Sequence, residues 1–180
     1  VLADAYSPNG PNLLTHYQAT RIWSFFDPES YAQNYAYQTL HSRYAISSGG
    51  LEGVGLFNSS GLVPVPMTDF LFGILGEELG FIGCSCMLVL FVILIGRILW
   101  IAKKSDTMYG KLVCVGVATW IAMQSFIHIG VTTAVLPNTG LPLPFMSYGL
   151  SSLVSNMAAI GLVMHVYAGI QNKTAKYKYI

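Results

Sequence analysis

Three long apolar runs occupy the second half of the chain, whereas the first 67 residues mix short apolar and polar stretches. The runs cover about Phe70–Ile101, Leu112–Leu136 and Leu150–Ile170. Each reaches the ~20 residues that a helix needs to cross a bilayer. Residues 1–67 contain no such run and carry five prolines. The pattern therefore predicts an all-α integral membrane protein, a helical bundle with three transmembrane helices preceded by an N-terminal loop region.

We predict the boundary between these two regions after residue 67. Residues 1–67 form a loop region with short interfacial helices, since Tyr17–Phe26 combines aromatic residues with one arginine. Tyr31–Ala45 is predicted as a further short helix. Residues 68–180 form the transmembrane region and a polar tail. Three spans are too few to enclose a large cavity, so we expect a single domain belonging to a larger membrane protein, as a fragment or through gene truncation.

Acidic and small residues mark the start of the first span. Thr68–Gly83 reads TDFLFGILGEELGFIG, with Asp69 at its mouth and Glu77 and Glu78 about two turns inside. At about 100° per residue its four glycines share one face. We expect this face to dock against helices outside this chain, because glycine lets backbones approach closely. Carboxylates in a span are costly and indicate a site; the alternative is that Thr68 and Asp69 cap the helix and the glutamates pair with neighbours.

Two other segments carry polar groups with more than one interpretation. The glycine-dense segment Ser47–Gly55 is either a flexible loop or a set of backbone N–H groups gathered around an anion. In the second span Gln124, Ser125, His128 and Thr132 share one side, which predicts a polar face turned toward the bundle. His128 is either a hydrogen-bonded packing residue or a proton relay.

The link between the second and third spans is rich in proline and glycine. Pro137–Gly149 holds three prolines and two glycines, so it does not continue a helix. Irregular backbone at membrane depth is tolerated only where protein or water satisfies its polar groups. We therefore expect neighbouring parts of the protein to supply those partners.

The charged residues are few and unevenly placed. The chain is 53% hydrophobic and 9% charged, and seven of its nine Lys and Arg residues flank the loop after the first span or the tail after the third. The positive-inside rule makes this side cytoplasmic, so the N-terminal loop region is extracytoplasmic and the C-terminal tail cytoplasmic. With a net charge of +1 and no basic patch, a nucleic-acid partner is excluded. The three cysteines lie in apolar runs and are typical of small hydrophobic residues rather than metal ligands.

Three ordered segments of the chain resemble the SEDS family of bacterial cell-wall polymerases, which includes FtsW, RodA and SpoVE. The segments are Tyr37-Gln38 with Ser42 and Gly49–Gly55, then Thr68–Phe72 with Gly76–Gly80, and Leu136–Ser152. The resemblance covers nearly the whole chain, from about Thr15 to Ile170, and corresponds to the family's large outer loop and last three helices. The chain departs from the family at Val63–Met67, where Leu-Pro-Glu-x-His is usual, at His128, where Asn is common, and at Leu150, where a second glycine is usual.

The resemblance implies an inverting peptidoglycan glycosyltransferase. Such an enzyme polymerises the undecaprenyl-pyrophosphate precursor lipid II into glycan strands at the outer face of the cytoplasmic membrane, in cell division or cell-shape maintenance. Its implied partners are lipid II, a class B penicillin-binding protein transpeptidase and the lipid bilayer. Two alternatives stay open: a lipid II flippase or transporter, and a truncated, non-catalytic partner of a cell-wall synthase.

The resemblance also implies roles at matching positions. Asp69 is the expected catalytic carboxylate, acting as general base toward the acceptor hydroxyl. The leaving pyrophosphate needs positive charge, and Arg21 and Arg43 are the two basic residues expected on the outer side. We favour Arg43, which follows the matched Ser42; a divalent cation (Mg²⁺ or Mn²⁺) held by Asp69 is the alternative. Glu77 and Glu78 are expected supporting acids. The expected substrate-binding residues are Gln38, Ser42, Arg43, Gly49, Gly50 and Ser147.

Overall fold

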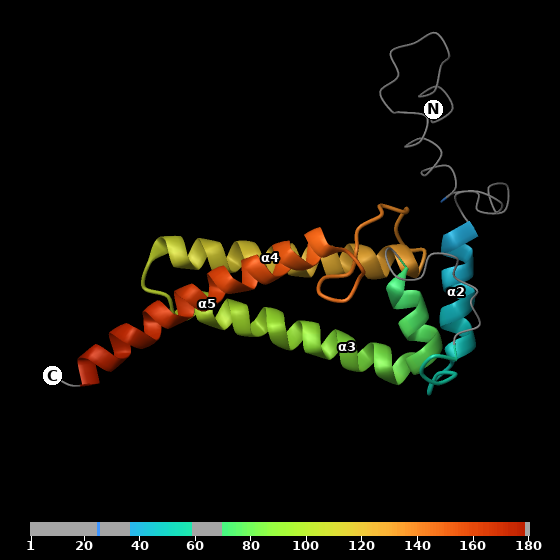
Figure 1. Ribbon diagram of the computed structural model, residues 1–180, viewed down its shortest axis with the longest axis horizontal. Helices are drawn as coiled ribbons and strands as arrows, with labels where there is room; N and C mark the ends of the chain where they lie inside the picture. The colour runs from blue at the N-terminus through green and yellow to red at the C-terminus, as the bar shows by residue number, and fades with distance from the viewer. Residues whose placement is uncertain (1–24, 26–36, 59–69, 179–180) are drawn as a thin grey trace, which may run out of the picture.

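The computed structural model of this chain describes residue 25 and residues 37–58 and 70–178 (Figure 1). These residues form helices and turns, with no strand among them. The helices are α2 (Tyr37–Gly49), α3 (Leu71–Lys104), α4 (Met108–Thr132) and α5 (Leu150–Lys178). The last three are long and apolar enough to cross a membrane. The all-helical class and the three spans are therefore confirmed. The division at residue 67 falls outside the described residues and stays a prediction.

The second span lies about four residues earlier than the hydrophobic run predicted. Thr107 explains its beginning, because the Thr107 hydroxyl oxygen accepts a hydrogen bond from the N–H of Gly110 at 3.2 Å and caps α4. At its other end the chain leaves the helix after Thr132, since Ala134 adopts a positive φ of 58°. Capping and backbone conformation, rather than hydrophobicity, thus determine where α4 begins and ends.

The long helix α3 breaks at Gly80, which corrects the expectation of a continuous helix from Thr68 to Gly83. Gly80 has φ 64° and ψ −165°, a conformation open to glycine and costly for other residues. Figure 1 shows the first turns of α3 beside α2, after which the helix changes direction and runs alongside α4. A Cβ at Gly80 would lie 2.6 Å from the carbonyl oxygen of Leu51 and would also overlap the backbone nitrogen of Gly53.

The residues that follow α2 hydrogen-bond with the broken part of α3. The N–H groups of Val54 and Gly55 donate to the carbonyl oxygens of Glu77 and Glu78, at 2.9 and 3.1 Å. In the reverse direction, Phe81 and Ile82 donate to carbonyl oxygens of the same turn: Phe81 N–H to Gly50 O at 3.0 Å and Ile82 N–H to Leu51 O at 3.2 Å. Residues 50–55 therefore replace hydrogen bonds that an unbroken helix would make within itself.

The glycines at the start of α3 contact α2, so the expectation that they dock helices outside this chain is wrong for Gly73 and Gly76. A Cβ at Gly73 would meet the side chain of Ser42, and one at Gly76 would lie 3.4 Å from Cβ of Ile46. The prediction that another backbone approaches these glycines closely is confirmed, but that backbone belongs to the short helix α2. A small buried cluster of Ala45, Phe70 and Val131 closes this junction between α2, α3 and α4.

A second core holds the three membrane-length helices together. It draws on α3, α4, the proline link and α5, and its buried members are Phe91, Ile98, Ala102, Cys114, Ala118, Ile121, Leu143 and Val163. The inclusion of Leu143 means that the link is packed into the bundle rather than lying on its surface.

Replacing Gly80 by alanine should destabilise the protein by about 2 kcal/mol or more. The new Cβ imposes the left-handed backbone penalty and overlaps residues 51–53. Gly116→Ala is the matched control, because a Cβ at Gly116 meets nothing within 4 Å and alanine favours helix. Thermal unfolding of both variants in detergent measures the difference. Equal melting temperatures would contradict the described break.

Candidate functional site

Two neighbouring residues of α2, Ser42 and Arg43, are predicted to bind substrate, but only one of them is exposed. Ser42 is fully buried, and its hydroxyl donates to the carbonyl oxygen of Thr132 at the end of α4, at 3.1 Å. Arg43 is exposed and makes no ion pair in the part of the chain that the structure describes. Ser42 thus joins the segment before α3 to α4, a contact that sequence reasoning did not assign, whereas the guanidinium of Arg43 is accessible to an anion.

Two predicted residues fall wholly or partly outside the described structure. Asp69 is not among the described residues, and of Gln38 only its place in the first turn of α2 is described. Phe70, which follows Asp69 in the chain, is buried (1% exposed) in the cluster with Ala45 and Val131. The roles of Asp69 and Gln38, and that of a divalent cation held by Asp69, stay predictions.

The two glutamates inside α3 differ in exposure. The side chain of Glu77 is 2% exposed, and that of Glu78 is half-buried. Both lie in the turn whose carbonyl groups pair with Val54 and Gly55. Glu77 is therefore enclosed by protein at the α2–α3 junction rather than facing lipid. Its predicted role as a supporting acid stays open.

Backbone hydrogen bonds to α3 order the segment after α2, which argues against a flexible loop. Gly49 ends α2 so close to α3 that a Cβ there would overlap the carbonyl oxygen of Gly76. Gly50 has φ 56°, and its carbonyl oxygen accepts the N–H of Phe81. Because the N–H groups of Val54 and Gly55 are also bonded to α3, they are not directed at an anion. Substrate contacts by Gly49 and Gly50 stay predictions.

Side chains of α4 hold the proline link in place. His128 Nδ1 lies 2.8 Å from the carbonyl oxygen of Leu141, and Gln124 Nε2 donates to that of Pro142 at 2.9 Å. Within the link, the Ser147 hydroxyl oxygen accepts the N–H of Leu143 at 2.7 Å. The predicted polar face of α4 is thereby confirmed. Sequence reasoning missed Gln124 as a partner of the link, although its place on that face was the available signal.

A cavity of about 270 Å³ lies beside the proline link. It is lined by Trp120 and Gln124 of α4, Pro142 of the link, and residues of the first turns of α5, among them Ser151, Ser155 and Asn156. Hydroxyl and amide groups thus predominate where α5 begins. This is the same end of the bundle at which α2 contacts α4.

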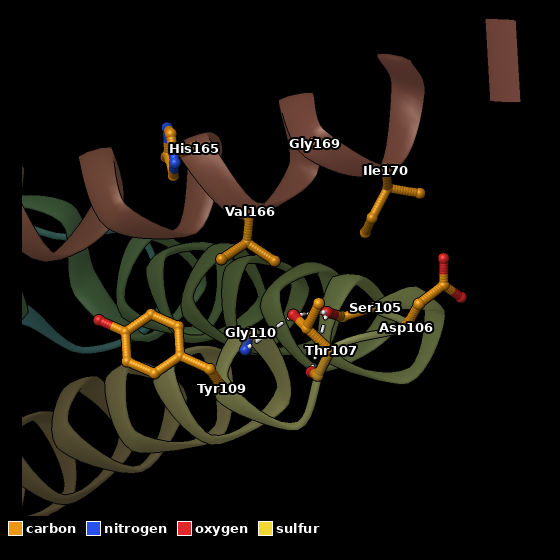
Figure 2. A pocket seen from close by; sticks show the side chains of 9 residues that line it. All are labelled: Ser105, Asp106, Thr107, Tyr109, Gly110, His165, Val166, Gly169 and Ile170. Atoms are coloured by element: carbon orange, nitrogen blue, oxygen red, sulfur yellow. Dashed lines mark hydrogen bonds between the residues drawn. The ribbon is translucent and has the colours of Figure 1, made fainter. Parts of the chain in front are cut away.

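A second cavity, of about 230 Å³, lies at the opposite end of the bundle (Figure 2). It opens between the α3–α4 turn, residues 105–110, and the part of α5 that includes His165 and Ile170. Figure 2 shows Val166 and Ile170 directed toward this turn, whose Ser105 and Thr107 are hydrogen-bonded to each other. None of the predicted site residues lines this cavity. Among the described residues, no group of three His, Cys, Asp or Glu side chains is placed to hold a metal ion.

Three membrane-length helices joined by a packed, irregular link define the class of this chain as a helical membrane protein. Residues 5–172 match the FtsW/RodA/SpoVE family, described as "Cell cycle protein". The chain belongs to this family, and the resemblance seen in its motifs is confirmed.

Individual relatives agree with this assignment. The chain is 43% identical over 166 residues to the probable peptidoglycan glycosyltransferase FtsW of Coxiella burnetii, covering 89% of this chain and 45% of that protein. It is 43% identical over 153 residues to the stage V sporulation protein E of Bacillus subtilis, covering 83% and 42%. It is 38% identical over 172 residues to the peptidoglycan glycosyltransferase MrdB of Escherichia coli K12, covering 93% and 46%. The chain thus spans less than half the length of these relatives.

A solved structure shows the same fold. The match is to a chain from work on the structural coordination of polymerization and crosslinking by a peptidoglycan synthase complex. The TM-score is 0.71 at 29% sequence identity, covering 87% of this chain and 43% of that one. The arrangement of α2 to α5 is therefore shared with part of a longer chain.

Gln124→Met should destabilise the full-length protein by about 1–3 kcal/mol, because the carbonyl oxygen of Pro142 loses its donor while the side chain keeps its length. Gln171→Met is the matched control. Its Nε2 bonds only the exposed Tyr167 hydroxyl one turn away, so little change is expected. Thermal unfolding in detergent compares the two. Equal destabilisation by the two substitutions would show that the hydrogen bond from Gln124 to Pro142 makes no specific contribution to stability.

Proposed function

We propose that this chain supplies part of a peptidoglycan glycosyltransferase that polymerises lipid II at the outer face of the cytoplasmic membrane. The observation that carries the proposal is membership of the FtsW/RodA/SpoVE family, with relatives that are named peptidoglycan glycosyltransferases. The proposal extends to the membrane orientation, with the segment before α3 outside and the C-terminal tail inside. It also extends to pairing with a class B penicillin-binding protein, supported by the likeness to a chain of a peptidoglycan synthase complex.

The proposed reaction needs a base. The 4-hydroxyl of the acceptor GlcNAc attacks C1 of the donor sugar, a new C–O bond forms, and the bond from C1 to the undecaprenyl pyrophosphate breaks with inversion. We assign Asp69 to take the proton of the attacking hydroxyl. General base catalysis by a positioned carboxylate contributes about 10²–10⁴-fold in rate.

The described neighbours of Asp69 support this role. The next residue, Phe70, is buried in the cluster where α2, α3 and α4 meet. The same junction is held by the Ser42 contact with α4 and by the backbone pairing at Gly80. A catalytic group needs a support that keeps its position within fractions of an ångström. The packing at the beginning of α3 is a support of this kind.

Arg43 is the proposed electrostatic partner of the leaving pyrophosphate. Its side chain is exposed on α2 and makes no ion pair in the described residues. An arginine can bond phosphate oxygens with two parallel N–H groups, which is among the stronger protein–anion contacts. Charge stabilisation of this kind acts where negative charge develops in the transition state.

Asp69→Asn in the full-length protein should abolish glycan polymerisation from purified lipid II, since asparagine keeps the shape and removes the base. Gel analysis of the glycan strands measures the product. Asp106→Asn, which changes a carboxylate in the α3–α4 turn, should leave polymerisation unchanged. Retained polymerisation by Asp69→Asn would remove Asp69 from the mechanism. Transfer of lipid II across liposomes without any strand formation by the native protein would favour a flippase instead.

Arg43→Gln should lower kcat/KM for lipid II by about 10- to 100-fold, the loss expected for one charge-assisted contact with a phosphate. Lys111→Gln removes an equal charge from the first turn of α4 and should leave kcat/KM within about twofold. Initial rates over a range of lipid II concentrations provide both values. An Arg43→Gln enzyme with native kinetics would show that this side chain does not contact the substrate.

A further inference from the structure

Two basic side chains share one aromatic ring near the C-terminal end of α3. The guanidinium carbon of Arg97 lies 5.2 Å from the centroid of the Trp100 ring, and Lys104 Nζ lies 3.9 Å from it. All three side chains are exposed. Cation–π attraction at these distances holds both charges beside the same indole. The helix therefore presents a preformed pair of positive charges on one side.

No described carboxylate compensates this pair. Neither Arg97 nor Lys104 makes an ion pair in the part of the chain that the structure describes. Like charges held close together repel, more strongly where the surroundings are less polar than water. An anion placed between the two side chains would remove this repulsion and gain charge-assisted hydrogen bonds from both.

The same side of α3 is apolar and open toward the middle of the helix. At about 100° per residue, Val89, Ile93, Gly96 and Trp100 fall within roughly a 60° arc. Val89 and Ile93 are more than half exposed, and a Cβ at Gly96 would meet nothing within 4 Å. Ile98, which belongs to the bundle core, points to the opposite side. This side of α3 thus offers a shallow apolar strip that ends at two cations.

The position along the helix matches the edge of a bilayer. Arg97 follows the Gly80 break by 17 residues, about 26 Å of helix at 1.5 Å per residue. The hydrocarbon core of a bilayer is about 30 Å thick. Tryptophan prefers the membrane–water interface, and basic residues there attract anionic lipids. The pair of cations therefore falls at headgroup depth when the apolar part of α3 spans the hydrocarbon.

We propose that this side of α3 binds an anionic phospholipid, with the headgroup phosphate between Arg97 and Lys104 and an acyl chain along Gly96, Ile93 and Val89. This occupant fits the site in charge and in shape. The two cations at one end can bind a phosphate, and the exposed apolar strip, which has no side chain at Gly96, can accommodate a flexible acyl chain. By the positive-inside rule the lipid belongs to the cytoplasmic leaflet, the side opposite the proposed polymerisation chemistry. The proposal does not depend on the glycosyltransferase assignment.

Native mass spectrometry of the full-length protein tests the lipid site, with phosphatidylglycerol as the anionic probe and phosphatidylcholine as the zwitterionic one. The native protein should retain phosphatidylglycerol preferentially. The double variant Arg97→Gln/Lys104→Gln should lose about ten- to thirtyfold in affinity for it. Lys111→Gln is the control, because it removes a basic charge at the same end of the bundle but from α4, away from the strip on α3, and its affinity should stay within about twofold.

Equal retention of the two lipids by the native protein would overturn the proposal, as would equal loss of phosphatidylglycerol in the Lys111→Gln control and the double variant. A photo-crosslinking residue at position 93 provides a second measurement that leaves both cations in place. Crosslinking to phospholipid in native membranes supports the site, whereas crosslinking to a polypeptide would show that a protein covers this face.

Discussion

The hydrogen bonds between residues 50–55 and the break of α3 at Gly80 are the constraint on which this part of the molecule depends. A broken helix exposes carbonyl and N–H groups that are costly where water is excluded. Here four backbone hydrogen bonds satisfy them, two in each direction. Those bonds also fix the end of α2 against α3, so that Ser42 reaches Thr132 and Phe70 is enclosed with Ala45 and Val131. One irregularity in a membrane-length helix thus positions the segment that precedes it.

The backbone carbonyl groups of the proline link are also satisfied by protein, here by side chains of α4. Gln124 and His128 of α4 contact the carbonyl groups of Pro142 and Leu141, and Leu143 is buried in the main core. Figure 1 shows that the link and α2 lie at one end of the bundle, while the α3–α4 turn lies at the other. The polar groups associated with the proposed chemistry gather at the first end, and the cations of the proposed lipid site lie toward the second.

Much of this architecture was predictable because it depends on local pattern. Run length predicted the three spans, and the side shared by Gln124 and His128 predicted the polar face of α4. The break at Gly80 was not predictable, since a glycine inside an apolar helical pattern is compatible with a continuous helix. Its partners lie about thirty residues earlier and outside the membrane-length runs. The sequence correctly indicated that another helix approaches the glycine face closely. It did not indicate which helix, because that depends on tertiary contacts.

The predicted site stays a prediction, because its central residue lies outside the described part of the chain. Ser42 and Ser147 were predicted from family position to bind substrate, and both hydroxyls are found in hydrogen bonds to backbone groups. Periodicity does not reveal such bonds, since a serine hydroxyl serves a substrate or a buried carbonyl equally well. Arg43, by contrast, is exposed as a contact with substrate requires.

The docking of α2 on the glycine face of α3 should also hold in the full-length protein, and a disulfide between the two helices can show whether it does. A Cβ at Gly76 would lie 3.4 Å from Cβ of Ile46, close to the separation that a disulfide needs. Ile46→Cys and Gly76→Cys would be combined in a full-length protein whose native cysteines are replaced by alanine. The pair should crosslink under mild oxidation, and the oxidised protein should polymerise lipid II as fast as the reduced one. Failure to crosslink, or polymerisation that returns only after reduction, would contradict this docking.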